Sequence, residues 1–322
     1  MKNVFRVIVI IFILLTGKMS RSFGQDFQKD TVKVGIYITS IHDIDFKKKE
    51  YYITFWLWLK YKNKDFDFLK NLEIPQAKSV DKSFSLVDSS GDNIYMQMKL
   101  ECVMKDSWRI QNFPFDRQRL RVAIENSQFD SRYLVFVPDT VGAHFDPRFT
   151  LRGWRIDSCV MSTGTKIYET GFGDDELAKP RTEYSTFRTI LSIKRDAGGL
   201  FWKMFLGMYV AFLISFICFY IHSDGMDSRF GLSVGSLFAV VGNKYIIDSS
   251  LPESSSFTLV DTLHGITLFY IVFVVAANAY SLRLIKRDQV KKAIKIDNWL
   301  AVIVFTSYLL LNIWFIWQAS QE

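Results

Sequence analysis

Residues 227–252 combine apolar side chains with an unusual number of small and polar ones. The segment, DSRFGLSVGSLFAVVGNKYIIDSSLP, is apolar enough to enter a membrane, yet it contains three glycines together with Asn243 and Lys244. A helix that faced lipid on every side would not carry so many of these residues. Such a stripe can line a water-filled path for ions. Helical spacings of three and four place its members on one side, and they are Gly231, Gly235, Phe238, Gly242, Tyr245 or Ile246, and Ser249.

Both ends of this segment are charged, and the side of the helix opposite the glycines is apolar. Asp227 and Arg229 lie at one end and Asp248 lies at the other. The alternative interpretation is a small-xxx-small seam, from Gly231 to Gly235, that packs two helices together. Residues outside the segment must decide between a pore wall and a packing seam. The stripe opposite the glycines is expected to be oily and comprises Leu232, Leu237, Val241 and Ile247.

Four apolar segments, this one included, are long enough to cross about 30 Å of hydrocarbon at about 1.5 Å per residue. They span residues 200–221, 230–247, 263–285 and 299–317. The short basic link between the third and fourth segments is expected to stay cytoplasmic, which returns the C-terminus to the other side. The same basic residues can hold anionic lipid headgroups. Aromatic residues typical of the membrane boundary are Trp202, Tyr209, Trp299, Trp314 and Trp317.

Residues 1–24 have the pattern of a secretory signal peptide. Lys2 and Arg6 precede an apolar run over residues 7–15, and small residues follow near Gly24. The run is too short to span a bilayer, so we expect its removal; the alternative is a retained anchor. Residues 25–197 are therefore predicted to lie outside the cytoplasm, and residues 198–322 are predicted to form the membrane domain.

Length, charge and cysteine content limit the possible classes of protein. A chain of 322 residues has room for two domains, and a hydrophobic fraction of 49% is high for a soluble protein. The net charge of +7 does not indicate a nucleic-acid partner, because the basic residues gather beside the membrane segments. Cys102, Cys159 and Cys218 make neither a disulfide framework nor a metal motif, although a single Cys102–Cys159 bond is possible.

Residues 25–197 consist of short β-rich runs separated by turn residues. Strands at this spacing, without a helical period between them, predict an antiparallel β-sandwich. The sequence contains no nucleophile elbow, phosphate loop or metal-ligand spacing, and its four histidines are scattered. We therefore predict no enzyme activity, no cofactor and no metal. The strand candidates are residues 31–40, 51–61, 83–87, 94–104, 118–124, 133–137, 154–161 and 185–194.

A loop between two of these strands, residues 111–118, has the sequence QNFPFDRQ. It resembles the signature of the pentameric ligand-gated ion channels, the Cys-loop receptor superfamily. Animal members have two cysteines that flank this loop, whereas Asp106 and Leu120 stand at the corresponding positions here, as in bacterial members without the disulfide. The resemblance extends to the first two strands, to Ile193-Lys194-Arg195 before the membrane, and to four membrane segments of which the second ends in Leu251-Pro252.

The resemblance implies a β-sandwich followed by a four-helix transmembrane domain, assembled as a homopentamer around a pore for monovalent cations. Phe238 would form an apolar constriction in that pore; its alternative role is packing between helices. Rings of Asp227 and Asp248 would favour cations over anions. Arg229 either neutralises the Asp227 ring or points back into the helix packing. Lys244 either pairs with Asp248 or faces the pore, where it would reverse the selectivity.

The resemblance also implies where the two domains communicate. Asp45, Asp116 and Arg195 are expected to meet as a charge cluster between the sandwich and the membrane domain. Phe113 and Phe115, on either side of Pro114, would form an apolar tip, with Phe115 near the linker that starts at Pro252.

The ligand site of the family would lie under the hairpin of the last two strands. Aromatic cages attract ammonium ligands, while the acidic residues 174–176 of the hairpin can hold an amine or a divalent cation, or form a solvated loop. Protons are the other candidate agonist, and His264 is interpreted either as a satisfied membrane histidine or as a proton sensor. The aromatic candidates are Tyr168, Phe172 and Tyr184, faced by Trp56 or Trp58 of the adjacent subunit.

The predicted function is a ligand- or proton-gated channel in the cell membrane, or in the inner membrane of a Gram-negative cell. The alternative is a non-conducting membrane receptor that binds a solute with the same sandwich and uses its glycines for packing. An exported hydrolase anchored by helices would need a clustered catalytic constellation, which we do not find in the sequence.

Overall fold

The computed structural model describes residues 29–173, 180–221 and 225–321. The predicted signal peptide and the acidic residues 174–176 lie outside the described residues. The first part of the described chain is built from β-strands and one short helix, α2 (Phe68–Asn71). The strands are β1 (Asp30–Asp45), β2 (Glu50–Tyr61), β3 (Leu72–Glu73), β4 (Ala77–Ser90), β5 (Asn93–Lys105), β6 (Arg117–Asn126), β7 (Leu134–Pro138), β8 (Trp154–Tyr168) and β9 (Thr182–Arg195).

These strands form two sheets that pack face to face. The first sheet has the order β4-β5-β2-β1-β7 and the second the order β3-β6-β9-β8. On β2, Phe55 and Leu57 are fully buried, whereas Trp56 and Trp58 lie on the outer face. The inward side chains share one core with Phe187 of β9. This alternation is expected of a sheet with one face in the core, and it confirms the predicted β-sandwich.

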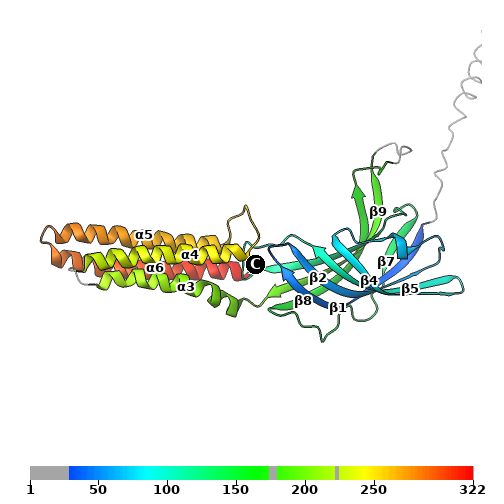
Figure 1. Cartoon of the computed structure of the whole chain (residues 1–322), viewed down its shortest axis with the longest axis horizontal. Coiled ribbons are helices and arrows are strands. Elements are labelled where there is room, and N and C mark those ends of the chain that lie inside the picture. The colour runs from blue at the N-terminus through cyan, green and yellow to red at the C-terminus, as the bar shows by residue number, and fades with distance from the viewer. Residues whose placement is uncertain (1–28, 174–179, 222–224, 322) are drawn as a thin grey trace, which may run out of the picture.

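The two ends of the sandwich differ in what they contact. β8 and β9 form a hairpin that projects from the body of the sandwich (Figure 1), with Tyr168 paired to Thr182 near its tip. The β1–β2 turn lies at the opposite end, where Lys47 Nζ donates to the Ser249 carbonyl at 3.5 Å. Cys102 and Cys159, for which a disulfide was possible from the sequence, are both free thiols.

Four long helices follow the sandwich: α3 (Ala197–Ile217), extended by the 3₁₀ turn η1 (Cys218–Tyr220), α4 (Met226–Ser250), α5 (Leu259–Ile285) and α6 (Val290–Gln321). Each is long and apolar enough to cross a membrane, so the chain is a multi-pass membrane protein. The helices run alongside one another, and α6 returns the C-terminus to the end of the bundle next to the sandwich (Figure 1).

The fourth helix starts earlier than the segment predicted from residue 299. α6 begins at Val290, so most of the basic link is helical and only residues 286–289 connect it to α5. The link contains no Gly or Pro, and its Lys, Ala and Ile side chains are compatible with a helix. Hydropathy detects only the apolar part of a helix, so it does not reveal the polar residues with which α6 begins.

Gly35 makes room for the ring of Trp58 on the outer face of the first sheet. The two residues are paired in the β1–β2 register, and a Cβ on Gly35 would lie 2.3 Å from Cζ2 of the Trp58 ring. The ring nitrogen Nε1 donates to Oδ2 of Asp139 at 3.0 Å. This hydrogen bond and the neighbouring Lys33 ammonium hold the pKa of Asp139 below its ordinary value.

We predict that Gly35→Ala displaces the Trp58 ring and breaks its hydrogen bond to Asp139. The free energy of unfolding should fall by about 1–3 kcal/mol, as at other overpacked sites, and thermal melts of the purified protein in detergent measure this. Gly164→Ala on β8 is the matched control, because no described atom lies within 4 Å of its added Cβ. Equal melting temperatures for the two variants would contradict the prediction.

Candidate channel helix, coupling interface and ligand site

The glycine stripe of α4 faces away from the rest of the subunit. All of the predicted pore-lining residues are exposed in the single chain, including Phe238, Tyr245 and Ile246 at 69%, 76% and 68%. No atom of another described element lies within 4 Å of a Cβ placed on Gly231 or Gly235. A pore lining and a packing seam would therefore both require a partner outside this subunit.

Only part of the oily stripe predicted on the opposite side of α4 faces the bundle, since Ile247 is buried and Leu237 is half-buried. Leu232 and Val241 are 39% and 47% exposed, and the side chains that face the bundle include Ser233 and Ser236. These serines can be buried because each has a hydrogen-bond partner. Ser236 Oγ donates to the Leu232 carbonyl at 2.8 Å, and Ser233 Oγ lies 3.4 Å from Cys218 Sγ.

Arg229 points into the helix packing, the second of the two orientations that the sequence allows. Its Nη1 lies 2.8 Å from Oδ2 of Asp297 on α6, and both residues are 3% exposed. The guanidinium also donates to the Ile221 carbonyl, while Ser281 on α5 donates to the same Asp297 oxygen at 3.1 Å. Asp227 remains exposed. This buried pair, of which Asp297 was not a sequence candidate, ties the start of α4 to α6.

The opposite end of α4 carries a second set of polar contacts. Lys244 Nζ lies 2.5 Å from Asp248 Oδ2 and 2.9 Å from Asp261 Oδ1 of α5. One ammonium thus serves two carboxylates. His264 is fully buried, with Nδ1 at 2.8 Å from the Val260 carbonyl and Nε2 at 3.0 Å from Asn243 Oδ1. Both partners are oxygen acceptors, and a neutral imidazole carries one N–H, so it can donate to only one of them. The two interpretations of His264, a satisfied membrane histidine and a proton sensor, therefore both stay predictions.

Asp116 and Arg195 meet where the sandwich contacts the helices. Arg195 Nε and Nη2 donate to the two carboxylate oxygens of Asp116 at 2.7 and 3.2 Å. The guanidinium also lies over the rings of Trp154, Phe46 and Phe113, at 4.0, 4.7 and 4.9 Å from their centroids. A bidentate pair with aromatic faces around it fixes the orientation of the guanidinium. Phe46 and Trp154 were not among the predicted residues.

Asp45 does not join this ion pair. Its Oδ1 accepts from the backbone N–H of Lys48 at 2.8 Å, and its Oδ2 lies 3.7 Å from Lys48 Nζ. The turn brings these partners closer than Arg195, since Lys48 is only three residues away. Asp45 and Arg195 line the same cavity, together with Leu251 at the end of α4.

Phe115 contacts α3. Its ring centroid is 5.6 Å from that of Phe201, near the start of α3. The linker between α4 and α5 meets the beginning of the same loop, where the Gln111 carbonyl accepts from Leu259 N–H at 2.7 Å. The neighbouring Phe113, Pro114 and Pro252 are buried. The loop thus lies against the helices, while the proximity of Phe115 to the linker stays a prediction.

Tyr168, Phe172 and Tyr184 come together near the tip of the β8–β9 hairpin. Their ring centroids are 5.5 Å apart for Tyr168–Phe172, 5.8 Å for Tyr168–Tyr184 and 6.2 Å for Phe172–Tyr184. All three pairs are edge-on, the geometry that aromatic rings in contact prefer over a face-to-face stack. Phe172 is 62% exposed, which leaves the group open on one side.

A buried carboxylate, missed in the sequence, lies beside these rings. Tyr168 Oη donates to Glu125 Oε2 at 2.8 Å, and Glu125 is 4% exposed. Burial raises the pKa of Glu125, and the hydrogen bond from Tyr168 partly opposes that shift. Glu73 is the register partner of Glu125 on β3, so two acidic residues lie next to the aromatic group. In the sequence, Glu125 is marked only by its place directly after the apolar residues 122–124 of β6.

Trp56 and Trp58 lie on the other sheet from these rings. Trp56 packs edge-on against Phe84 of β4, with centroids 5.6 Å apart, and Trp58 is held by Asp139. Both are on the outward face of β2.

The Arg229–Asp297 pair leads to a stability prediction. Arg229→Gln or Asp297→Asn leaves the other group without its partner, which should cost about 3–5 kcal/mol. The double variant Arg229→Met/Asp297→Leu should be more stable than either single variant. Thermal melts of the purified protein measure all three, with Arg283→Gln, an exposed arginine at the end of α5, as the control. Single variants that melt with the control would contradict the assignment of the pair.

Comparison with known proteins identifies relatives at low identity. No protein-family model matches the sequence. Over 183 residues, 55% of this chain, it is 21% identical to a gamma-aminobutyric acid receptor subunit beta of Caenorhabditis elegans, of which it covers 30%. Over 185 residues, 56% of this chain, it is 23% identical to a glutamate-gated chloride channel of Drosophila melanogaster, of which it covers 36%. The chain thus spans about a third of the length of these curated relatives.

The relatives and the fold agree with the resemblance carried by the loop at residues 111–118. A β-sandwich precedes four apolar helices, and the homologues are ligand-gated channels rather than enzymes. The chain is therefore similar, at low sequence identity, to members of the Cys-loop receptor superfamily.

Proposed function

We propose that this chain is a subunit of a ligand-gated ion channel that assembles as a homopentamer, with residues 25–197 as the ligand-binding domain and residues 198–322 as the channel domain. The observation that carries the proposal is the free stripe of α4. One face of this membrane helix is committed to the bundle, whereas the other, with its glycines and Phe238, is exposed. Five copies related by a rotation would turn these stripes toward a common axis.

In such a ring Phe238 is the gate. Its side chain is 69% exposed and no described aromatic ring pairs with it. Five phenyl rings around an axis form a narrow apolar neck, which excludes water without a physical plug. The glycines at positions 231, 235 and 242 leave the pore wide on either side of that neck.

The charges of α4 favour monovalent cations as the permeant ions. Asp227 is exposed at one mouth, and Arg229 is withdrawn from it by Asp297. At the other mouth Lys244 is shared between Asp248 and Asp261, which leaves a net negative charge. Carboxylate rings raise the local cation concentration. One relative is a chloride channel, so anion selectivity is the contrary outcome.

The hairpin rings favour a small amine as the agonist. An ammonium group at the open side of Tyr168, Phe172 and Tyr184 would meet aromatic faces and the negative potential of Glu125 and Glu73. Trp56 or Trp58 of the next subunit would close the site. Gamma-aminobutyric acid, in the name of the worm relative, carries such an amine. A proton agonist acting on these carboxylates is the alternative.

The proposed location is the cell membrane, or the inner membrane of a Gram-negative cell, with the sandwich and the C-terminus outside the cytoplasm. The end of α6 lies beside the sandwich (Figure 1), whereas the basic residues near the α5–α6 connection lie at the far end of the bundle. Basic residues at one end of the helices predict that this end is cytoplasmic. Anionic lipid headgroups are the expected neighbours of that end.

Ion flux through purified protein in liposomes tests the proposal, and Phe238→Ser tests the gate. The variant should raise the resting leak at least about tenfold, because a hydroxyl ring lowers the barrier to water by more than about 1.4 kcal/mol. Phe269→Ser on α5, a residue 68% exposed, is the matched control and should leave the leak unchanged. A reversal potential that follows the potassium gradient supports cation selectivity, and one that follows the chloride gradient overturns it. No flux from verified pentamers would favour a non-conducting receptor.

Arg195 tests the coupling between the two domains. Arg195→Ala should abolish currents evoked by a panel of primary amines and by acid pulses, since Asp116 then loses its bidentate partner in a buried site. Arg188→Ala, on the exposed face of the same strand, should keep them. Size-exclusion chromatography separates failed gating from failed assembly. Normal currents in a well-assembled Arg195→Ala channel would remove this residue from the mechanism.

A further inference from the structure

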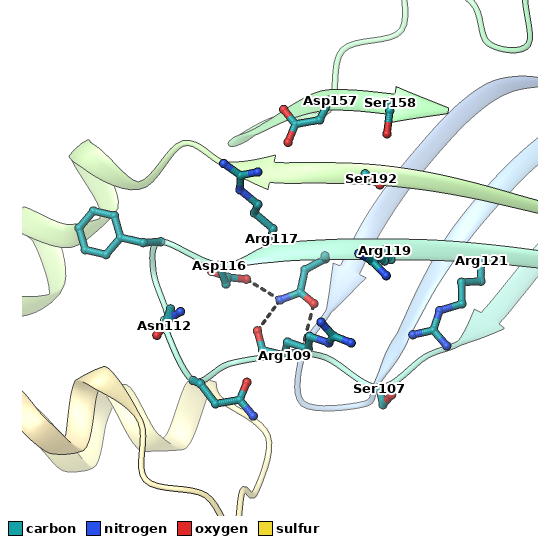
Figure 2. A pocket seen from close by; sticks show the side chains of 13 residues that line it. Ser107, Arg109, Asn112, Asp116, Arg117, Arg119, Arg121, Asp157, Ser158 and Ser192 are labelled. Carbon is teal, nitrogen blue, oxygen red and sulfur yellow. Dashed lines mark hydrogen bonds between the residues drawn. The ribbon is translucent and has the colours of Figure 1, made fainter. Parts of the chain in front are cut away.

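A cavity of about 680 Å³ lies on the outer face of the second sheet, at the end next to the helices. β6 contributes Arg117, Arg119 and Arg121 at alternate positions, and alternate residues of a strand share one face. Arg109, from the loop before β6, adds a fourth guanidinium (Figure 2). Gln118 holds the backbone of Arg109 in place, with Nε2 donating to its carbonyl at 2.7 Å and Oε1 accepting from its N–H at 3.0 Å.

The positive charge of this cavity is poorly balanced. Of the two acidic residues that line it, Asp116 is occupied by Arg195, which leaves Asp157. Arg121 has only a distant partner, Asp106, at 3.9 Å. In the part of the chain that the structure describes, no carboxylate lies within 4.0 Å of Arg109, Arg117 or Arg119.

The strand register adds to the excess of positive charge. Arg117 is directly opposite Lys194 of β9, and Lys194 is directly opposite Arg155 of β8. Like charges at opposed positions destabilise a sheet. Lys194 and Arg155 thus bring the cations in and beside this cavity to six, and a bound anion would reduce their mutual repulsion.

The side chains around the arginines suit an oxyanion. Ser107, Ser158 and Ser192 place hydroxyl donors on the same cavity, and Arg binds phosphate oxygens through two parallel N–H bonds. We propose that this cavity is a binding site for a phosphate group, held by Arg109, Arg119 and Arg121.

The location of the cavity indicates two sources for that group. Asn112 and Phe115 also line it, and Phe115 contacts α3. A smaller cavity of about 170 Å³ shares Asn112 and extends to Phe315 and Gln318 at the end of α6. The site thus lies at the level where the helices leave the membrane. The headgroup of an anionic phospholipid and inorganic phosphate from solution both carry the required chemistry.

Binding to the full-length purified protein tests this site without any measurement of ion flux. Native mass spectrometry counts bound phosphatidylglycerol, with diacylglycerol as the phosphate-free lipid, and calorimetry in chloride buffer measures inorganic phosphate. Arg109→Gln/Arg119→Gln should weaken binding at least about tenfold, because each lost charge-assisted bond is worth about that factor. Lys64→Gln/Arg152→Gln removes the same charge from exposed positions outside the cavity and should bind as the wild type does.

The variant Arg109→Lys/Arg119→Lys keeps the charges and changes the geometry of the donors. Its affinity for phosphate should lie between those of the wild type and the glutamine variant. Binding of phosphatidylglycerol alone assigns the site to a lipid headgroup, and binding of inorganic phosphate assigns it to a soluble anion. Both outcomes support the proposal. It is overturned if neither probe binds the wild type, or if the glutamine variant binds as tightly as the Lys64→Gln/Arg152→Gln control.

Discussion

The ion pair between Arg195 and Asp116 stands where the chain passes from the sandwich into the membrane. Arg195 ends β9 and α3 begins at Ala197, so this guanidinium fixes the direction in which the first helix leaves the sheet. Asp116 is 3% exposed, and a carboxylate so deeply buried is costly to desolvate. Asp116 accepts two hydrogen bonds from the Arg195 guanidinium and one from Gln118 Nε2 at 2.6 Å. The guanidinium in turn lies over the ring of Trp154, 4.0 Å from its centroid. These contacts offset the cost of desolvation. The pair is thus one of the contacts that hold the loop at residues 111–118 over the helices, together with the Phe115–Phe201 contact and the hydrogen bond from Leu259 N–H to the Gln111 carbonyl.

Buried charges in the membrane domain are also paired, like Arg195 and Asp116, whereas the unpaired carboxylate of Asp227 faces outward. Arg229 is turned into the bundle by Asp297, and Lys244 lies between Asp248 and Asp261. Both cations of α4 are therefore engaged by carboxylates, while Asp227 is exposed. A helix with this distribution can present small, apolar and acidic groups to a water-filled axis and remain anchored at both ends.

Local spacing predicts some features of this chain and leaves others undetermined. The alternation of β2 and the helical stripe of α4 could be predicted, because each depends on residues two to four positions apart. The side of α4 that packs could not, since Ser233 and Ser236 are polar and still buried through partners that hydropathy does not see. Glu125 and Asp297 matter because of residues distant in the chain, Tyr168 and Arg229. Asp45 was assigned by resemblance to a distant arginine, but the turn itself offers the nearer Lys48.

A contiguous series of contacts connects the sandwich to α4 without passing through Arg195. The Gln111 carbonyl holds the N–H of Leu259 at the start of α5. Two residues later Asp261 completes a capping box with Thr258 and also binds Lys244 of α4 at 2.9 Å. Asp261 thus contacts both the start of α5 and the end of α4 next to the sandwich, so a shift of the loop at residues 111–118 must either carry α4 with it or break one of these contacts. Packed elements joined by such bonds change between discrete arrangements rather than deforming continuously, and an all-or-none gate requires this property.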